Sequence, residues 1–305
     1  MSLHELFTTF ANNLLPIMLI ATAGYILGKF LILDSRSIGR IVFYIFSPLL
    51  VFNLMVTSQL DLRQAMSTVA YTACVIAIMG VIAFALGKIF QLERPHLLAV
   101  ILTVAFGNTG NYGLPLVQFA FGEEALAVAS IFFVTTTILF NTVGVVIASL
   151  GHTDLKSAIL GVFKLPSVYG VGLALLVRVS GFQIPLPLSR TIEIAASGAV
   201  PVMIVLLGLE LTRLQWSHSF RALGIGVFAK LLLGPVVGML LAGAFGMQKH
   251  AYQGVVVDAA LPAAVATTVV AGEYQLEPSL VTAIVFLGTI LSPLTLTPLL
   301  VYLLR

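Results

Sequence analysis

The chain has 305 residues, of which 59% are hydrophobic and only 9% are charged. Soluble domains carry about 25% charged residues, so this composition excludes a water-soluble enzyme. The net charge of +3 is too small for a nucleic-acid-binding surface, and the one cysteine, Cys74, excludes a disulfide-stabilised fold. The composition therefore predicts an all-α polytopic membrane protein whose surroundings are the lipid bilayer, with no nucleic-acid partner.

Ten segments are long and apolar enough to cross a bilayer, since a span needs roughly 20 mostly apolar residues. No soluble domain lies between them, and the longest polar stretch runs from Gly151 to Lys156. The first span lacks the basic region and cleavage site of a signal peptide, so we expect it to be retained. The predicted spans are about 12–32, 37–58, 66–90, 97–120, 125–149, 160–180, 190–211, 219–245, 250–272 and 279–303.

Lysines and arginines in the loops predict the orientation, because cytoplasmic loops carry the excess of positive charge. The excess falls on the cytoplasmic side when the N-terminus is placed outside. The sequence therefore predicts a multi-pass protein of the cell membrane with both termini outside the cytoplasm. The larger set is Lys29, Arg36, Arg40, Lys88, Arg94, Lys156, Lys164, Arg213 and Arg221, and the smaller set is Arg63, Arg178, Arg190, Lys249 and Arg305.

The chain divides into two halves of five predicted spans each, residues 1–150 and residues 151–305. Pro16 opens the first half and Pro166 the second, and Pro48 and Pro201 follow in the next span of each. Five crossings is an odd number, so the two copies must have opposite orientations. Inverted repeats of this kind are typical of transporters, whose substrate site lies at the repeat interface. A chance likeness between short apolar helices is the alternative.

The fourth span carries three glycines, two asparagines and a proline between Gly107 and Pro115. Glycine costs about 1 kcal/mol and proline about 3 kcal/mol inside a helix, so we predict a discontinuous helix that lines a cavity. The half-helix after the break would present its N–H groups to an anion, and the asparagine amides suit a carboxylate or a cation. A packing face of small residues is the alternative. The candidate substrate-binding residues here are Asn108, Thr109, Asn111, Gly113 and Pro115.

The ninth span contains the counterpart, from Asp258 to Thr268, in which Pro262 breaks the helix. Thr267 and Thr268 offer hydroxyls that can replace lost backbone hydrogen bonds. A simple proline kink is the alternative. Interrupted helices at matching places in two halves point to a site near the membrane midplane, so Pro262, Thr267 and Thr268 join the candidate substrate-binding residues.

Several different short motifs are spread over nearly the whole chain. They are Pro48-Leu49-Leu50, Asn108-Thr109, Gly113-Leu114-Pro115-Leu116, Leu207-Gly208-Leu209, Lys230-Leu231, Gly234-Pro235, Ala259-Ala260-Leu261-Pro262, Glu273-Tyr274 and Pro278. Together they resemble the motifs of the auxin efflux carrier family, which includes plant PIN-type carriers and bacterial permeases. The sodium-coupled bile acid symporters share its general architecture. Two positions depart from the plant pattern: Thr267 stands where plant carriers have a second proline, and Asp258 where they commonly have a glutamine.

The resemblance implies ten transmembrane helices in a 5+5 inverted repeat, with two broken crossing helices and both termini outside the cytoplasm. It also implies a scaffold domain, a transport domain and an elevator-like motion. The substrates of the family are organic anions, auxin in plants and small carboxylates such as malonate or malate in bacteria. The long cytoplasmic loop of many plant members is absent, so its regulation does not carry over.

Most charged residues lie near the ends of the predicted spans, and Asp258 and Lys230 are the notable pair inside them, where an unpaired charge costs several kcal/mol. Asp258 precedes Pro262 by one helical turn, and we hypothesise that it couples transport to a proton or a cation. A structural ion pair with Lys230 is the alternative. Lys230 would balance a substrate carboxylate, pair with Asp258 or reach an interface, with a structural use favoured. Glu210 ends the seventh span and is interpreted as interfacial. No His, Cys and carboxylate pattern has metal-ligand spacing, so no metal or cofactor is expected.

The sequence thus predicts a secondary transporter, an efflux carrier or permease, for a small organic anion such as a carboxylate. No phosphate-binding loop of the G-x-x-x-x-G-K-[ST] form occurs, so a proton, a sodium or the substrate's own gradient would drive it. Asn108, Asn111 and Thr267 offer neutral oxygens that could bind sodium or a carboxylate, so a sodium-coupled symporter is an alternative. A channel is a further alternative. An intramembrane enzyme is disfavoured, because the sequence shows no clustered set of catalytic residues. Import and export are both compatible with the sequence. Assembly as a homodimer is compatible with it as well.

Overall fold

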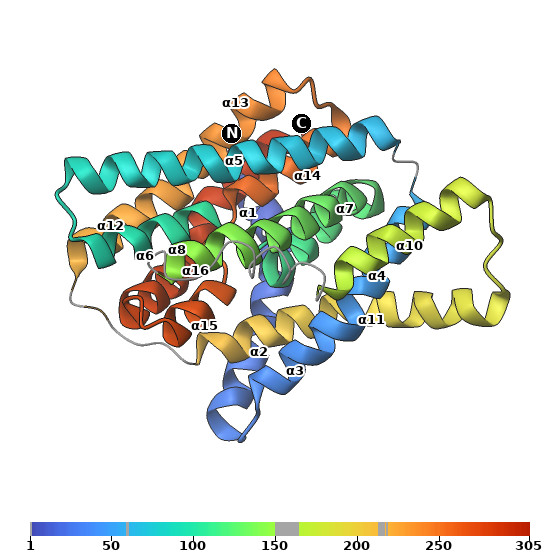
Figure 1. The fold of residues 1–305 in the computed structure, drawn as a ribbon, viewed down its shortest axis with the longest axis horizontal. Helices are drawn as coiled ribbons and strands as arrows, with labels where there is room; N and C mark the ends of the chain where they lie inside the picture. The colour runs from blue at the N-terminus through green and yellow to red at the C-terminus, as the bar shows by residue number, and fades with distance from the viewer. Residues whose placement is uncertain (1, 59–60, 150–164, 213–216, 218) are drawn as a thin grey trace.

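A computed structural model describes residues 2–58, 61–149, 165–212, 217 and 219–305. Within these ranges the backbone forms helices, and the one strand-like contact is an antiparallel bridge between Gly107 and Ala263. Figure 1 shows long helices stacked in layers, with the hairpin of α10 and α11 extending outward at the right of the view. The all-helical fold predicted from the sequence is confirmed.

The helices of the first half include several short π-helical segments, labelled η, inside longer runs. They are α1 (Leu3–Thr9), η1 (Phe10–Leu14), α2 (Leu15–Phe30), α3 (Ser35–Ile41), η2 (Val42–Phe46), α4 (Ser47–Thr57), α5 (Leu62–Ile89), α6 (Arg94–Ala105), η3 (Thr109–Gly113), α7 (Leu114–Leu139), η4 (Phe140–Gly144) and α8 (Val145–Ala148). Those of the second half are α10 (Pro166–Ser180), α11 (Leu186–Leu211), α12 (Phe220–Phe228), η5 (Ala229–Leu233), α13 (Gly234–Ala244), α14 (Lys249–Ala260), α15 (Ala266–Glu273) and α16 (Pro278–Leu303).

Seven helical runs in the described part of the chain are long and apolar enough to cross a membrane. Two shorter apolar helices, α6 and α10, accompany them. The fourth and fifth predicted spans share α7, in which Gly122 adopts a positive φ of 77° and kinks the chain. The start of the sixth span at 160, the boundary between residues 150 and 151, and Lys156, Lys164 and Arg213 lie outside the described residues. The division into ten spans therefore stays a prediction.

Helix starts and ends follow local rules of the sequence. Asp34 accepts hydrogen bonds from the backbone N–H groups of Arg36 and Ser37 at the start of α3, and Asp61 caps α5 in the same way. A proline stands in the first turn of α2, α4, α6, α7, α10, α11, α13 and α16, where its missing N–H costs nothing. Gly181, with a φ of 65°, ends α10.

Small residues bring α2 and α11 into backbone contact. A Cβ atom at Gly208 would collide with the carbonyl group of Ala21, and one at Gly24 would collide with that of Val205. Such close approach is how helices associate in lipid, where hydrophobic surface alone gives little attraction. In the same way α10 packs on α4 at Gly170, whose Cβ would lie 2.7 Å from the oxygen of Pro48. Because α11 also contacts α4, we call α2, α4, α10 and α11 the scaffold group.

The remaining long helices form a second packing group around α14. α14 contacts α7, α13 and α5, and α5 contacts α6 and α7. Inside this group the hydroxyl of Tyr71, on α5, donates to the carbonyl oxygen of Gly238, on α13, over 2.9 Å. Both helix breaks predicted from the sequence belong to this set, so we call α5, α6, α7, α12, α13, α14, α15 and α16 the crossover group.

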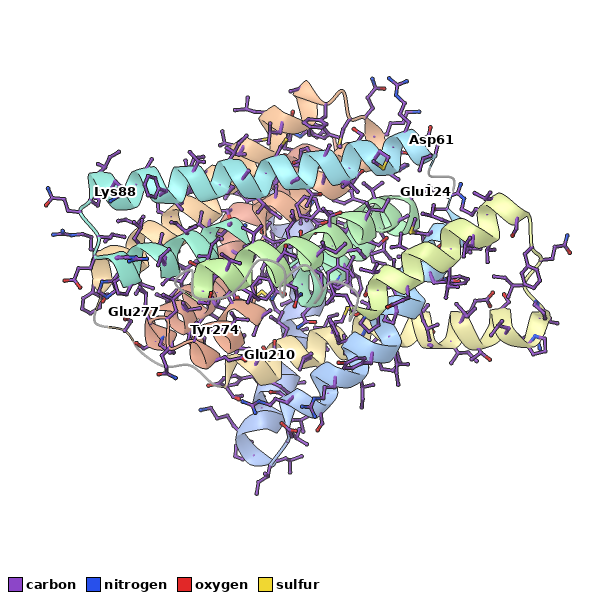
Figure 2. All side chains as sticks on the ribbon, in the orientation of Figure 1. Asp61, Lys88, Glu124, Glu210, Tyr274 and Glu277 are labelled. Carbon is purple, nitrogen blue, oxygen red and sulfur yellow. The ribbon has the colours of Figure 1, made fainter. Side chains whose placement is uncertain are left out.

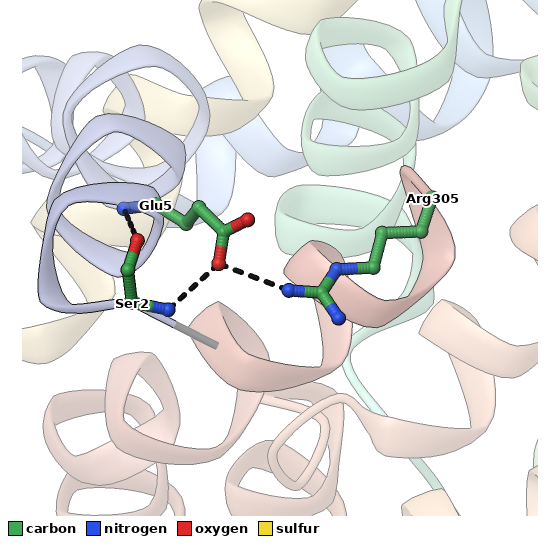
Figure 3. Close-up of polar contacts among 3 residues, drawn as sticks. All are labelled: Ser2, Glu5 and Arg305. Atoms are coloured by element: carbon green, nitrogen blue, oxygen red, sulfur yellow. Dashed lines mark hydrogen bonds and ion pairs between the residues drawn. The ribbon is translucent and has the colours of Figure 1, made fainter.

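The two ends of the chain meet. The backbone N–H of Ser2 donates to the Glu5 carboxylate, and the Glu5 N–H donates to the Ser2 hydroxyl, so that α1 begins with a capping box. The same carboxylate accepts from Arg305 Nη2 over 2.9 Å (Figure 3). The first and last turns of the chain therefore lie next to each other.

Candidate functional site

The two helix breaks cross and pair with one another. The Asn108 N–H donates to the carbonyl oxygen of Pro262 over 2.8 Å, and the Ala264 N–H donates to that of Phe106 over 2.9 Å. These bonds flank the bridge between Gly107 and Ala263. In lipid every freed backbone group must find a partner inside the protein. Each break therefore supplies backbone partners that the other one needs.

Further hydrogen bonds, from side chains and from the backbone, satisfy free carbonyl groups on either side of the crossing. The Thr267 hydroxyl donates to the carbonyl oxygen of Ala264 over 2.6 Å, and the Thr268 hydroxyl donates to that of Val265 over 2.8 Å. On the other break, the Gly113 N–H donates to the Asn108 carbonyl over 3.0 Å. The threonines thus satisfy carbonyl groups at the start of α15, which is the structural role that the sequence assigned to them.

A cavity of about 1080 Å³ reaches the crossing from one end of the molecule. It lies between the scaffold group, through α4 and α11, and the crossover group, through α7, α15 and α16. Among the candidate residues, Asn108, Thr109, Asn111 and Thr268 line it. Four other candidates are buried and do not belong to its lining: Gly113, Pro115, Pro262 and Thr267.

Charged side chains gather where the cavity opens. Arg36 and Arg40, one helical turn apart on α3, are exposed and line it, as does exposed Glu273 at the end of α15. In the sequence these two arginines indicate only the orientation of the chain, although their spacing of four residues places them on one helix face. Half-buried Glu210, at the end of α11 (Figure 2), also lines the cavity and accepts a hydrogen bond from Asn111 Nδ2 over 3.4 Å.

Two opposite charges lie behind the crossing, away from the cavity lining. The Asp258 side chain is 1% exposed, and a Cβ atom at Gly113 would lie 2.5 Å from its Oδ1. Lys230 is 3% exposed, and its Nζ would lie 3.3 Å from a Cβ at Gly107. Neither oxygen of Asp258 has a hydrogen-bond partner in the described part of the chain, and Asn108 Nδ2 has none either. The ion pair considered from the sequence is therefore not a direct contact.

A buried carboxylate without a direct partner is costly and points to a bound proton or cation. No three His, Cys, Asp or Glu side chains of the described ranges gather in one place. The oxygens of Asp258 are thus the one pair of buried carboxylate oxygens in these ranges that lacks a hydrogen bond. Asp258 is therefore a candidate for charge coupling, together with buried Lys230.

Comparison with known proteins gives the family. The model of a family described as "Membrane transport protein" matches residues 9–300. An uncharacterized transporter of Methanocaldococcus jannaschii is 27% identical over 92% of this chain and 95% of its own length, and one of Methanothermobacter thermautotrophicus is 24% identical over 93% and 95%. A protein of Rhizobium meliloti, whose name provisionally assigns it malonate transport, is 32% identical over 66% of this chain and 65% of its own. The chain belongs to the membrane transport protein family, as its resemblance to the auxin efflux carriers predicted.

Proposed function

We propose that this protein is a secondary transporter of a small organic anion, with a carboxylate as the group that it recognises. The observation that carries the proposal is the cavity, which ends on the paired breaks and is lined there by Asn108, Thr109 and Asn111. Amide and hydroxyl groups at helix ends bind anions without a fixed positive charge. The relative of Rhizobium meliloti, named for malonate, supports a small carboxylate as the substrate.

The two arginines at the cavity opening support an anionic substrate as well, while the carboxylates of Glu210 and Glu273 line the same cavity. Arg36 and Arg40 stand at its opening, where positive charge raises the local concentration of anions. The loop charges predict that this end of the molecule faces the cytoplasm. The cavity then opens inward, and both termini, which are next to each other, lie outside the cytoplasm. If both termini lie on the same side of the membrane, the chain crosses it an even number of times, such as ten times in a 5+5 inverted repeat.

The mechanism that we propose is elevator-type alternating access. The crossover group carries the paired breaks, and the scaffold group packs through the glycine contacts of α2 and α11. A crossing that is tied together by backbone hydrogen bonds would move as one rigid unit. Substrate bound at the breaks would then travel with the crossover group past α4 and α11, the scaffold helices that line the cavity.

Asp258 and Lys230 are the proposed coupling residues. The buried and unpartnered carboxylate favours cation coupling over uncoupled transport, because a proton or a sodium ion would relieve the cost of burying its charge. A sodium-coupled symporter is therefore the second candidate function. We expect Asp258→Asn to abolish the dependence of uptake on the coupling ion. Separate pH and sodium gradients across proteoliposomes identify the ion, and unaltered uptake under both would refute the coupling role.

Binding and counterflow test the proposed function directly. Purified protein is titrated calorimetrically with acetate, malonate, succinate and malate, and proteoliposomes loaded with the carboxylate that binds most tightly are tested for exchange of labelled substrate. We expect saturable exchange, which a channel or an enzyme would not give. Asn108→Ala is expected to weaken binding at least about tenfold, which corresponds to about 1.4 kcal/mol.

The matched control removes another buried asparagine. Asn13 lies in η1, donates to the carbonyl oxygen of Thr9 and does not belong to the cavity lining. Asn13→Ala should leave the affinity unchanged in folded protein. If none of the four carboxylates binds, or if both alanine variants lose binding equally, the crossing is not a carboxylate site and the proposal fails.

A further inference from the structure

A carboxylate of the protein already occupies one of the proposed substrate donors. The side-chain amide of Asn111 donates to Glu210 Oε2 over 3.4 Å, and both residues line the cavity. Asn111 lies on η3, next to the helix breaks, whereas Glu210 lies in the last turn of α11. The bond thus joins the crossover group to the scaffold group at the place where a substrate anion would bind.

We infer that Glu210 is an internal competitor of the substrate, whose carboxylate holds the Asn111 amide until a carboxylate substrate displaces it. This inference rests on the proposed function. An amide Nδ2 offers only two hydrogens, and one of them is directed at Glu210. A substrate carboxylate that approaches Asn111 also meets a like charge, so its binding requires Glu210 to move away from the amide.

The competition has a consequence for the movement of the empty carrier. While the bond is intact, it ties η3 to α11 and resists displacement of the crossover group along the scaffold group. A bound substrate replaces the bond and removes the tie. Glu210 thereby sets the affinity for the substrate and also favours movement of the loaded carrier over movement of the empty one.

Two variants of Glu210 and one control separate this role from the general effect of charge. Glu210→Gln keeps the shape but removes the charge, and Glu210→Ala removes the acceptor as well. Glu273→Gln is the matched control, because it removes the same charge from the lining of the same cavity at an exposed position. Each purified variant is titrated with acetate, malonate, succinate and malate, and net uptake and exchange are compared in proteoliposomes.

We expect the dissociation constant of the best carboxylate to fall by about tenfold in Glu210→Ala and by less in Glu210→Gln, since a charged hydrogen-bond partner is about twice as strong as a neutral one. Glu273→Gln should change it by less than about twofold, as a screened surface charge does. Net uptake should rise relative to exchange most in Glu210→Ala, which leaves Asn111 without this acceptor, and less in Glu210→Gln, whose amide oxygen can still accept the hydrogen bond.

The outcomes distinguish the two proposals. If carboxylates bind the wild type but the affinity is unchanged or weaker in the Glu210 variants, or if Glu273→Gln gains as much, the competition is refuted while the proposed function stands. If no carboxylate binds the wild type or any variant, the proposed function itself fails.

Discussion

Gly113 is the position at which the crossing tolerates least change. A Cβ atom there would lie 2.5 Å from Asp258 Oδ1 and 2.5 Å from Leu261 Cδ1, which is closer than real Cβ contacts come. Both neighbours are buried, at 1% and 0% exposure, so neither side chain can turn into solvent to make room. Gly113→Ala must therefore push η3 away from the end of α14. We expect it to destabilise the protein and to distort the candidate site.

The magnitude follows from the cost of overpacking, which is about 1–3 kcal/mol per inserted methyl group in a well-packed interior. Scaled to a chain of this size, at about 2 °C per kcal/mol, the melting temperature should fall by about 2–6 °C. Gly107→Ala should cost less, because its Cβ would meet the movable Lys230 Nζ at 3.3 Å.

Thermal unfolding of detergent-purified protein, followed by fluorescence-detected gel filtration, measures the series. The control is Gly80→Ala on α5, where no atom beyond the adjacent backbone of the same helix lies within 4 Å of the added Cβ. It should melt at the wild-type temperature or up to about 2 °C higher, because alanine is favoured over glycine in a helix by about 1 kcal/mol. If Gly113→Ala melts like Gly80→Ala, the close packing of η3 against α14 is refuted.

Three further variants test other contacts. Gly208→Val drives a side chain into the backbone of α2 and should prevent monodisperse folding in gel filtration; a normal elution profile would contradict the close helix approach. Tyr112→Phe removes a buried hydrogen bond of 3.1 Å to Ser292 and should lower stability by about 0.6 kcal/mol, so a loss as large as that of Gly113→Ala would be unexpected. Glu5→Gln breaks the exposed pair with Arg305 and should cost at most about 1 kcal/mol; a loss that persists in high salt would contradict a screened surface pair.

The positions of the helix breaks were predictable from single residues. Glycine, asparagine and proline disfavour a continuous helix between Gly107 and Pro115, and α6 ends at Ala105. Pro262 has the same effect on the ninth span, where α14 ends at Ala260. Proline disfavours the helix at these ends but does not end a helix by itself, since α11 continues through Pro201 and α16 through Pro293 and Pro298.

The partners of the breaks were not predictable, because they lie far apart in the sequence. Nothing local indicates that Gly107 pairs with Ala263, or that Glu210 reaches Asn111. From the sequence, Glu210 is interpreted only as an interfacial residue, because it ends the seventh predicted span. Likewise, four of the eight candidate binding residues are buried and do not line the cavity, since a sequence motif does not tell which side chains of a break face it.

The start of the first helix shows a local signal that was missed. The predicted span began at about residue 12, where the apolar run starts, but α1 begins at Leu3. The pair Ser2 and Glu5 has the spacing of a capping box, which marks a helix start independently of hydropathy. Apolar content therefore locates what lies in lipid, whereas capping residues locate where the backbone becomes helical.

The bridge between the two breaks also constrains how the protein is made. Residues 106–108 leave the ribosome long before residues 262–264, and half of the chain is synthesised between them. During that interval the Asn108 N–H and the Phe106 carbonyl lack their final partners, which is unfavourable in hydrocarbon. The fourth span must therefore wait near the translocon or near water until the ninth span arrives. Closing the crossing is then a late, long-range step of biogenesis, and truncation anywhere before Pro262 should leave a chain that the cell's quality control degrades.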